Sequence, residues 1–118
     1  MDVSQHVHLK LIGDVGFIGQ VKRFAEQDPE NLKVESETKD DDPTRLGFDL
    51  ATVSAVVVFV KGTLLVGELA AKLLKWMRHS EANKVVIQTP FQTLELHKDS
   101  GVTEEDVRKL LKAAMELH

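Results

Sequence analysis

Alternation between apolar and polar residues predicts the strands of this chain. Val7, Leu9 and Leu11 alternate with polar neighbours, a pattern typical of a strand with one buried face, and we expect this strand at 6–12. Shorter runs of the same kind predict further strands, at 32–35 and, as the two arms of a β-hairpin, at 84–88 and 93–97.

Apolar residues at helical spacing predict two amphipathic helices. The first covers about 16–27 and ends at Asp28-Pro29, because the residue before a proline is driven out of the α region. The second closes the chain after Thr103, which with Asp106 resembles a capping box. Their apolar faces consist of Phe17, Ile18, Val21 and Phe24, and of Val107, Leu110, Leu111, Ala114 and Met115.

The longest apolar stretch lies at 50–77. Its polar residues Ser54, Lys61, Glu68 and Lys75 follow one another at steps of seven, which on a helix places them in one narrow stripe. We therefore expect a long central helix kinked at Gly62. The valine-rich first half also fits a buried strand that ends at Gly62, and periodicity does not separate the two.

A helix over 50–77 would be about 42 Å long, longer than the roughly 30 to 35 Å expected across such a domain. Either Gly62 bends the helix or part of it projects, and a projecting part would be covered by a partner chain, a second copy or a membrane.

The segment 35–45 is polar and acidic and contains a proline, so we expect a solvated loop, with Asp49 as the cap of the following helix. The chain is then one α+β domain over 1–118, with the order β-α-β-α(long, kinked)-β-β-α and the sheet packed on the long apolar helix. A length of 118 residues leaves no room for a second domain.

The composition limits the cellular location and the kinds of partner that we expect for this chain. The chain has no cysteine, which excludes disulfides, thiolate metal sites and cysteine nucleophiles and favours a cytoplasmic location. The N-terminus lacks the basic and apolar regions of a secretory signal. Net charge is −4, although 50–80 holds four bases and one acid. Without a broad basic surface, we expect no nucleic-acid partner.

The candidate chemistry is sparse. The turn Gly13-Asp-Val-Gly16-Phe-Ile-Gly19 could present amides to a phosphate, but its spacing matches neither the dinucleotide fingerprint nor the P-loop, and a plain strand-to-helix connection explains it. His6, His8 and His97 could form a three-imidazole metal site, although exposed strand histidines explain them better. With no G-x-S-x-G or HExxH motif, we expect no enzyme, no cofactor and no metal.

One ordered set of motifs does resemble a known family. A helix ends at Gln27-Asp28-Pro29-Glu30, an apolar segment follows Leu46-Gly47 and ends in Leu-Leu-Lys-Trp-Met-Arg at 73–78, and a hairpin of the type V-x-I-x-x-P runs from Val85. In this order they resemble the effector-associated constant component, a family of small bacterial domains described from genome context in conflict systems. The resemblance covers about 8–116 and departs at Phe91-Gln92, where Asp-Gly is usual in that family.

The resemblance implies a non-enzymatic adaptor or regulator of a bacterial antiviral or conflict system, coupled to an effector encoded nearby, often a caspase-like or trypsin-like peptidase. We expect the apolar helix to carry the contact. The candidate partner-binding residues are Lys61, Leu65, Glu68, Leu69, Lys72, Leu73, Lys75 and Trp76. The sequence also leaves open whether the chain forms a homo-oligomer.

Two other functions stay open as well. The first is a membrane-active protein that inserts the 50–77 helix, and the second is a small-ligand domain with a pocket near Gly13, Gly16, His6 or His8.

Overall fold

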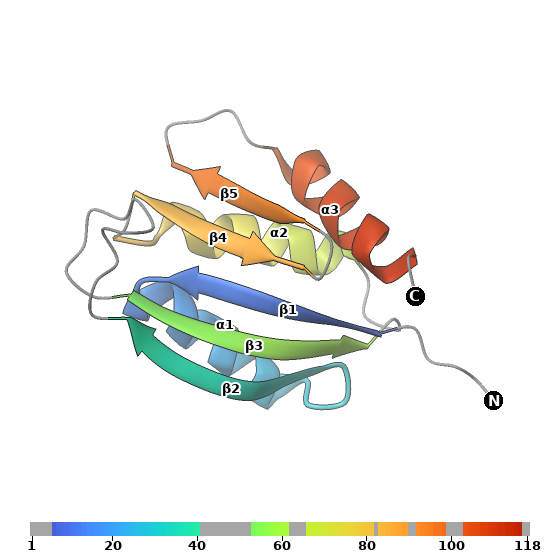
Figure 1. Cartoon of the computed structure of the whole chain (residues 1–118), viewed down its shortest axis with the longest axis horizontal. Helices are drawn as coiled ribbons and strands as arrows, with labels where there is room; N and C mark the ends of the chain where they lie inside the picture. Colours follow the sequence, from blue (N-terminus) through green and yellow to red (C-terminus); the bar gives the residue numbers. More distant parts are fainter. Residues whose placement is uncertain are drawn as a thin grey trace.

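The chain folds as an α+β domain with a five-stranded antiparallel sheet and three helices (Figure 1). The computed structural model describes residues 6–40, 53–61, 66–81, 83–89, 92–98 and 103–116. Its elements are β1 (His6–Gly13), α1 (Val15–Gln27), β2 (Leu32–Asp40), β3 (Val53–Lys61), α2 (Val66–Arg78), β4 (Lys84–Gln88), β5 (Thr93–His97) and α3 (Glu104–Glu116).

The sheet has the strand order β2-β3-β1-β4-β5, so β1 lies at its centre. Strand β3 lies between β1 and β2, and β1 lies between β3 and β4, which makes two split β-α-β units around α1 and α2. Helices α1 and α2 lie behind the sheet in Figure 1, and α3 packs on α2. The apolar faces of the helices and one face of the sheet therefore share one core.

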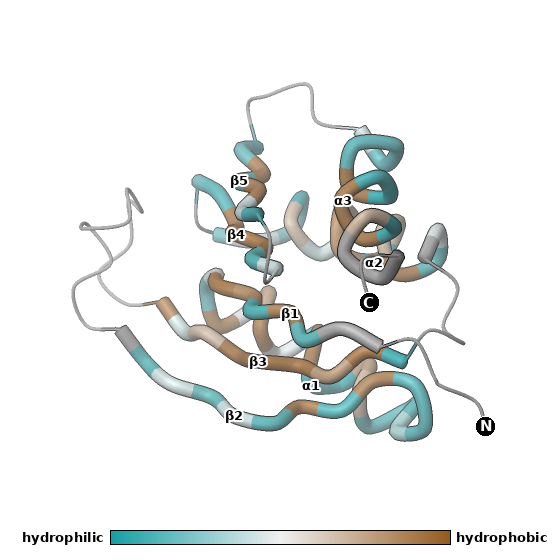
Figure 2. The backbone as a smooth tube through the Cα atoms, turned by 45° about the vertical axis from the view of Figure 1, so that its right-hand side comes forward, coloured by the Kyte–Doolittle hydropathy of each residue, from teal (hydrophilic) through white to brown (hydrophobic). Residues whose placement is uncertain are grey.

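Period-two alternation decides which strand residues enter this core. Leu9 and Leu11 of β1 and Val58 of β3 are at most 2% exposed and belong to the main cluster. On the opposite face, Ile12 and Val53 are also buried, in a second small cluster. Strand β3 is thus apolar on both faces, as its colour in Figure 2 shows.

The expectation of one long helix over 50–77 is wrong. Residues Val53–Lys61 form strand β3, and helix α2 covers only Val66–Arg78. A run of β-branched residues that is buried on one face and mostly half-buried on the other suits an inner strand, and β3 pairs with β1 on one side and β2 on the other. The seven-residue stripe therefore divides between a strand, with Ser54 and Lys61, and a helix, with Glu68 and Lys75. The proposed kink at Gly62 lies outside the described residues.

The expected loop at 35–45 is also wrong over its first part, because β2 continues to Asp40. A bulge between Val34 and Ser36 shifts the register against β3 and breaks the alternation. An edge strand also tolerates charged residues well, so its sequence looked like a loop. The expected cap at Asp49 lies outside the described residues. Within them, no helix is long and apolar enough to cross a membrane.

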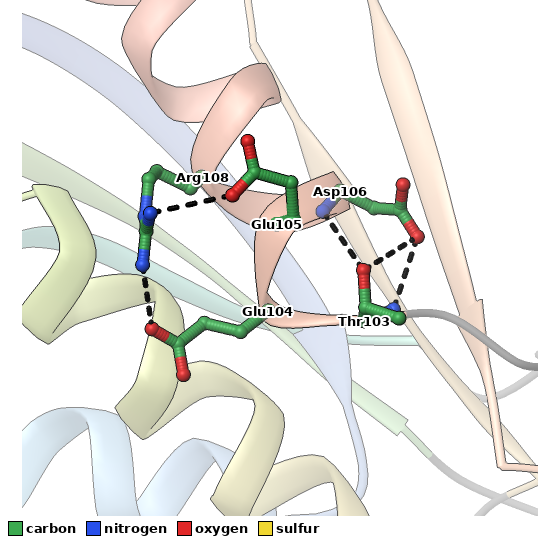
Figure 3. A network of polar contacts seen from close by, with 5 residues as sticks. All are labelled: Thr103, Glu104, Glu105, Asp106 and Arg108. Carbon is green, nitrogen blue, oxygen red and sulfur yellow. Dashed lines mark hydrogen bonds and ion pairs between the residues drawn. The ribbon is translucent and has the colours of Figure 1, made fainter.

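The expected start of the closing helix is confirmed. The Thr103 amide donates to Asp106 Oδ2 at 3.0 Å, and the Asp106 amide donates to Thr103 Oγ1 at 3.3 Å, which completes the reciprocal capping box (Figure 3). One turn on, Arg108 pairs with Glu104 at 2.9 Å and with Glu105 at 3.3 Å. Local polar contacts therefore stabilise the first turn of α3, in addition to the burial of Val107 in the core.

Candidate interaction surface

A buried carboxylate connects the start of α1 to the end of α2. Asp14 is 5% exposed and caps α1, where its Oδ1 accepts from the Phe17 amide at 3.0 Å. The same oxygen accepts from the Ser80 hydroxyl at 2.7 Å, and Oδ2 accepts from the Glu81 amide at 2.9 Å. Ser80 and Glu81 follow α2, so this one side chain fixes the two helices relative to each other.

Burial of the Asp14 carboxyl group by itself raises its pKa. Hydrogen bonds from the Glu81 amide, the Ser80 hydroxyl and the amides of Phe17 and Gly16 lower it by more, so the pKa lies below its usual value. The amides that could have met a phosphate in the Gly13 to Gly19 turn thus already serve the protein's own carboxylate. The turn is accounted for as a strand-to-helix connection.

Three of the candidate contact residues do not lie on an exposed side of α2. Leu69 and Leu73 are 2% and 0% exposed and belong to the main core. Lys61 is exposed but lies at the end of β3. Leu65 lies outside the described residues. The helix therefore leaves four candidates on its outer side.

These four are Glu68, Lys72, Lys75 and Trp76. Glu68 and Lys75 are exposed, whereas Lys72 and Trp76 are half-buried. The Trp76 ring lies against Phe24 of α1, with ring centroids 5.8 Å apart and planes tilted by 59°. The Lys72 ammonium lies 5.1 Å from the centroid of the Phe24 ring, close enough for a cation–π contact. The exposed part of Trp76 is thus held in place by a neighbour from another helix.

A hollow of about 230 Å³ lies beside Trp76, between the two helices. Gly16 and Gln20 of α1 line it together with Lys75, Trp76 and His79. We call Gln20, Lys72, Lys75, Trp76 and His79 the α1–α2 surface. The sequence did not indicate Gln20 and His79 as contact residues, because no local signal in the chain shows that α1 lies next to the end of α2.

The candidate metal ligands do not come together. Val86 of β4 pairs with Ile12 of β1 on one side and with Glu95 of β5 on the other, so these three residues lie at the same level in the sheet. His8 and His97 lie on opposite sides of this level, roughly 20 Å apart along the strand direction. His8 Nδ1 lies 2.8 Å from Glu35, and His97 Nε2 lies 3.1 Å from Glu95. Within the described residues, no group of three His, Asp or Glu side chains could hold a metal ion.

The Glu95 carboxylate also accepts from the Lys84 ammonium at 3.1 Å, and the Lys84 side chain is only 5% exposed. The hydrogen bond from Lys84, and after it that from His97, lowers the pKa of Glu95. This cluster crosses the β4–β5 hairpin and explains why a lysine is buried there.

Comparisons of the chain with models of protein families, with curated proteins and with solved structures give no match. The α1–α2 surface, with its tryptophan held by Phe24 and its two lysines, is the candidate interaction surface of the described residues.

Proposed function

We propose that the protein is a non-enzymatic adaptor of a bacterial conflict system, which acts in the cytoplasm and binds an effector, such as a peptidase, through the α1–α2 surface. The observation that carries the proposal is Trp76, a half-buried tryptophan held by Phe24 beside a hollow. Tryptophan is enriched among the residues that dominate binding energies, and it contributes most where a neighbour holds it rigid. The ordered motifs at 27–30, 73–78 and 85–96 support the choice of system.

The charges of this surface indicate which kind of partner surface would bind to it. Lys75 directly precedes Trp76 and Lys72 lies one turn before it, while Glu68 lies one further turn back and His79 follows the helix. We therefore expect an acidic patch around an apolar groove on the effector. Charges at the rim of an interface guide association and orientation more than they determine affinity.

Co-expression with the products of neighbouring genes tests the proposal. A tagged chain should retain one of these products through purification, and the double variant Lys72→Glu/Lys75→Glu should weaken the measured affinity by at least roughly tenfold, as expected when two charged contacts become repulsive. The matched control is Lys109→Glu/Lys112→Glu, which reverses two exposed lysines of α3. Circular dichroism establishes that both variants fold.

Three outcomes decide between the parts of the proposal. If no neighbouring product binds, the adaptor function is wrong. If one binds and the α2 variant binds as tightly as the α3 control, the function stands and the α1–α2 surface is the wrong site. If the α2 variant alone loses affinity, both are supported.

A further inference from the structure

The outer edge of β2 carries main-chain groups that no described strand pairs. Strand β2 is the first in the sheet order and pairs only with β3 among the described strands. The carbonyl of Asn31 accepts from the Lys61 amide of β3, so alternation directs the amide and carbonyl of Val34 to the open edge. The Leu32 amide is already bound to the carbonyl of Asp28.

The inner side of this edge has an apolar hollow. It has a volume of about 330 Å³ and lies between α1 and β2. Ala25, Leu32 and Val34 form its apolar lining, and Lys22 lies at its rim, paired with Glu37 at 3.0 Å. A single apolar side chain that follows the edge strand would fit there.

The outer side of the same edge has a second hollow, with a volume of about 370 Å³ and a different lining. Phe59 of β3 contributes an aromatic surface, and Lys33 and Lys61 contribute two ammonium groups. The carboxylates that line it are those of Glu30 and Glu35.

Glu35 is engaged by His8, 2.8 Å away. Neither Lys33 nor Lys61 forms an ion pair with a described residue. The outer hollow therefore offers cationic groups to whatever lies along the edge.

The two hollows share Leu32 and Lys33 of β2 in their linings, and Val34 lines the inner one. A strand added to this edge would direct successive side chains alternately to the inner and the outer face. Its inward side chains would meet an apolar hollow, and its outward side chains would meet Lys33, where an opposite charge directly across is favourable. The bulge between Val34 and Ser36 ends regular pairing, so only a short segment fits.

We propose that the β2 edge at 32–34 is a docking site for an extended segment of another protein in which apolar and acidic residues alternate. Its main-chain groups pair with Val34, its apolar residue fills the inner hollow, and its acidic residue faces Lys33. This site goes beyond the proposed function, because it uses none of the residues of the α1–α2 surface. An adaptor that couples two proteins needs two such surfaces.

The test uses a fluorescein-labelled, acetylated peptide of about seven residues in which leucine and glutamate alternate, since this is the length of an ordinary strand. The control peptide has the same composition with all the glutamates together. Binding to the full chain is followed by fluorescence anisotropy up to about 1 mM, the weak limit of specific recognition. Amide chemical shifts of 15N-labelled protein locate the contact.

Two variants probe the edge. Val34→Pro removes the outward amide, which the native sheet does not use, and Lys33→Glu reverses the outer charge. Each should weaken binding of the alternating peptide by roughly tenfold, the effect of losing one hydrogen bond or one charge pair. Lys39→Glu reverses an exposed lysine of the same strand beyond the bulge and should leave binding unchanged.

The proposal is overturned if the alternating peptide does not bind, if it binds no better than its control, or if Lys33→Glu binds as well as Lys39→Glu. It is also overturned if the chain is dimeric in light scattering and Val34→Pro makes it monomeric, because the occupant is then a second copy. If Val34→Pro does not fold, Lys33→Glu and the shifts of β2 amides carry the decision.

Discussion

Replacement of Asp14 should destabilise the protein far more than replacement of an ordinary helix cap. Asp14→Ala removes the cap of α1, a loss of about 1 kcal/mol. It also leaves the buried Ser80 hydroxyl and the Glu81 amide without their acceptor, at about 1 to 2 kcal/mol each. We expect the free energy of unfolding to fall by roughly 3 to 5 kcal/mol, which for this size lowers Tm by roughly 10 to 20 °C.

The loss of stability on replacement of Asp14 should depend on pH, and the pKa of Asp14 sets the direction of that dependence. Hydrogen bonds hold the pKa of Asp14 below its usual value in the folded state, so its contribution is fully present above the unfolded pKa of about 3.9. The contribution is lost as the pH falls through the folded pKa. The gap in stability between the wild type and Asp14→Asn should thus be largest near neutral pH and narrow in acid.

Urea unfolding measures this gap, and the fluorescence of Trp76, the only tryptophan, reports it because the ring lies against Phe24. The matched control is Asp106→Asn, which removes another helix-capping carboxylate that is exposed and has only local partners. A loss for Asp14→Asn no larger than that of the control, or a gap that does not change with pH, would refute the reasoning.

Three further predictions concern the core, α3 and the hairpin. Leu73→Ala empties a fully buried position and should cost roughly 2 to 5 kcal/mol in urea unfolding, whereas a loss below about 1 kcal/mol would contradict its place in the core. Thr103→Ala should cost about 1 kcal/mol and speed amide exchange in the first turn of α3 only, and faster exchange throughout the sheet would contradict a local role. Glu95→Gln removes the carboxylate that binds buried Lys84. Because that hydrogen bond lowers the pKa of Glu95, the destabilisation should appear at neutral pH and disappear in acid, and denaturation curves that differ equally at both pH values would argue against it.

Local signals determined much of the fold. The spacing of Phe17 to Phe24 and the break at Asp28-Pro29 predict α1, and Thr103 with Asp106 predicts the start of α3. These signals are reliable because the groups that satisfy each other lie within one or two helical turns. The β-hairpin at 84–97 is confirmed for the same reason, since its arms are neighbours in sequence.

The residues of the proposed α1–α2 surface were predicted only in part. Lys72, Lys75 and Trp76 were selected together because they share α2, and the charge pattern of one helix is visible in sequence. Their neighbours Gln20 and Phe24 come from α1, and no spacing in the chain indicates that the two helices meet there. The proposed docking edge was missed for a similar reason, because the alternation at 32–35 predicts a strand but not that this strand lies at the edge of the sheet.

The sequence by itself determined which segments are amphipathic, where α1 begins and ends, how α3 is capped and that 50–77 carries the most apolar residues. Only the tertiary structure decided that 53–61 is a strand, because a continuous apolar run has the same pattern in a helix and in an inner strand. The choice depends on β1 and β2, which pair with it from segments far away in the chain. The link from Asp14 to Ser80 was likewise decided by packing, since local sequence carries no information about a partner 66 residues away.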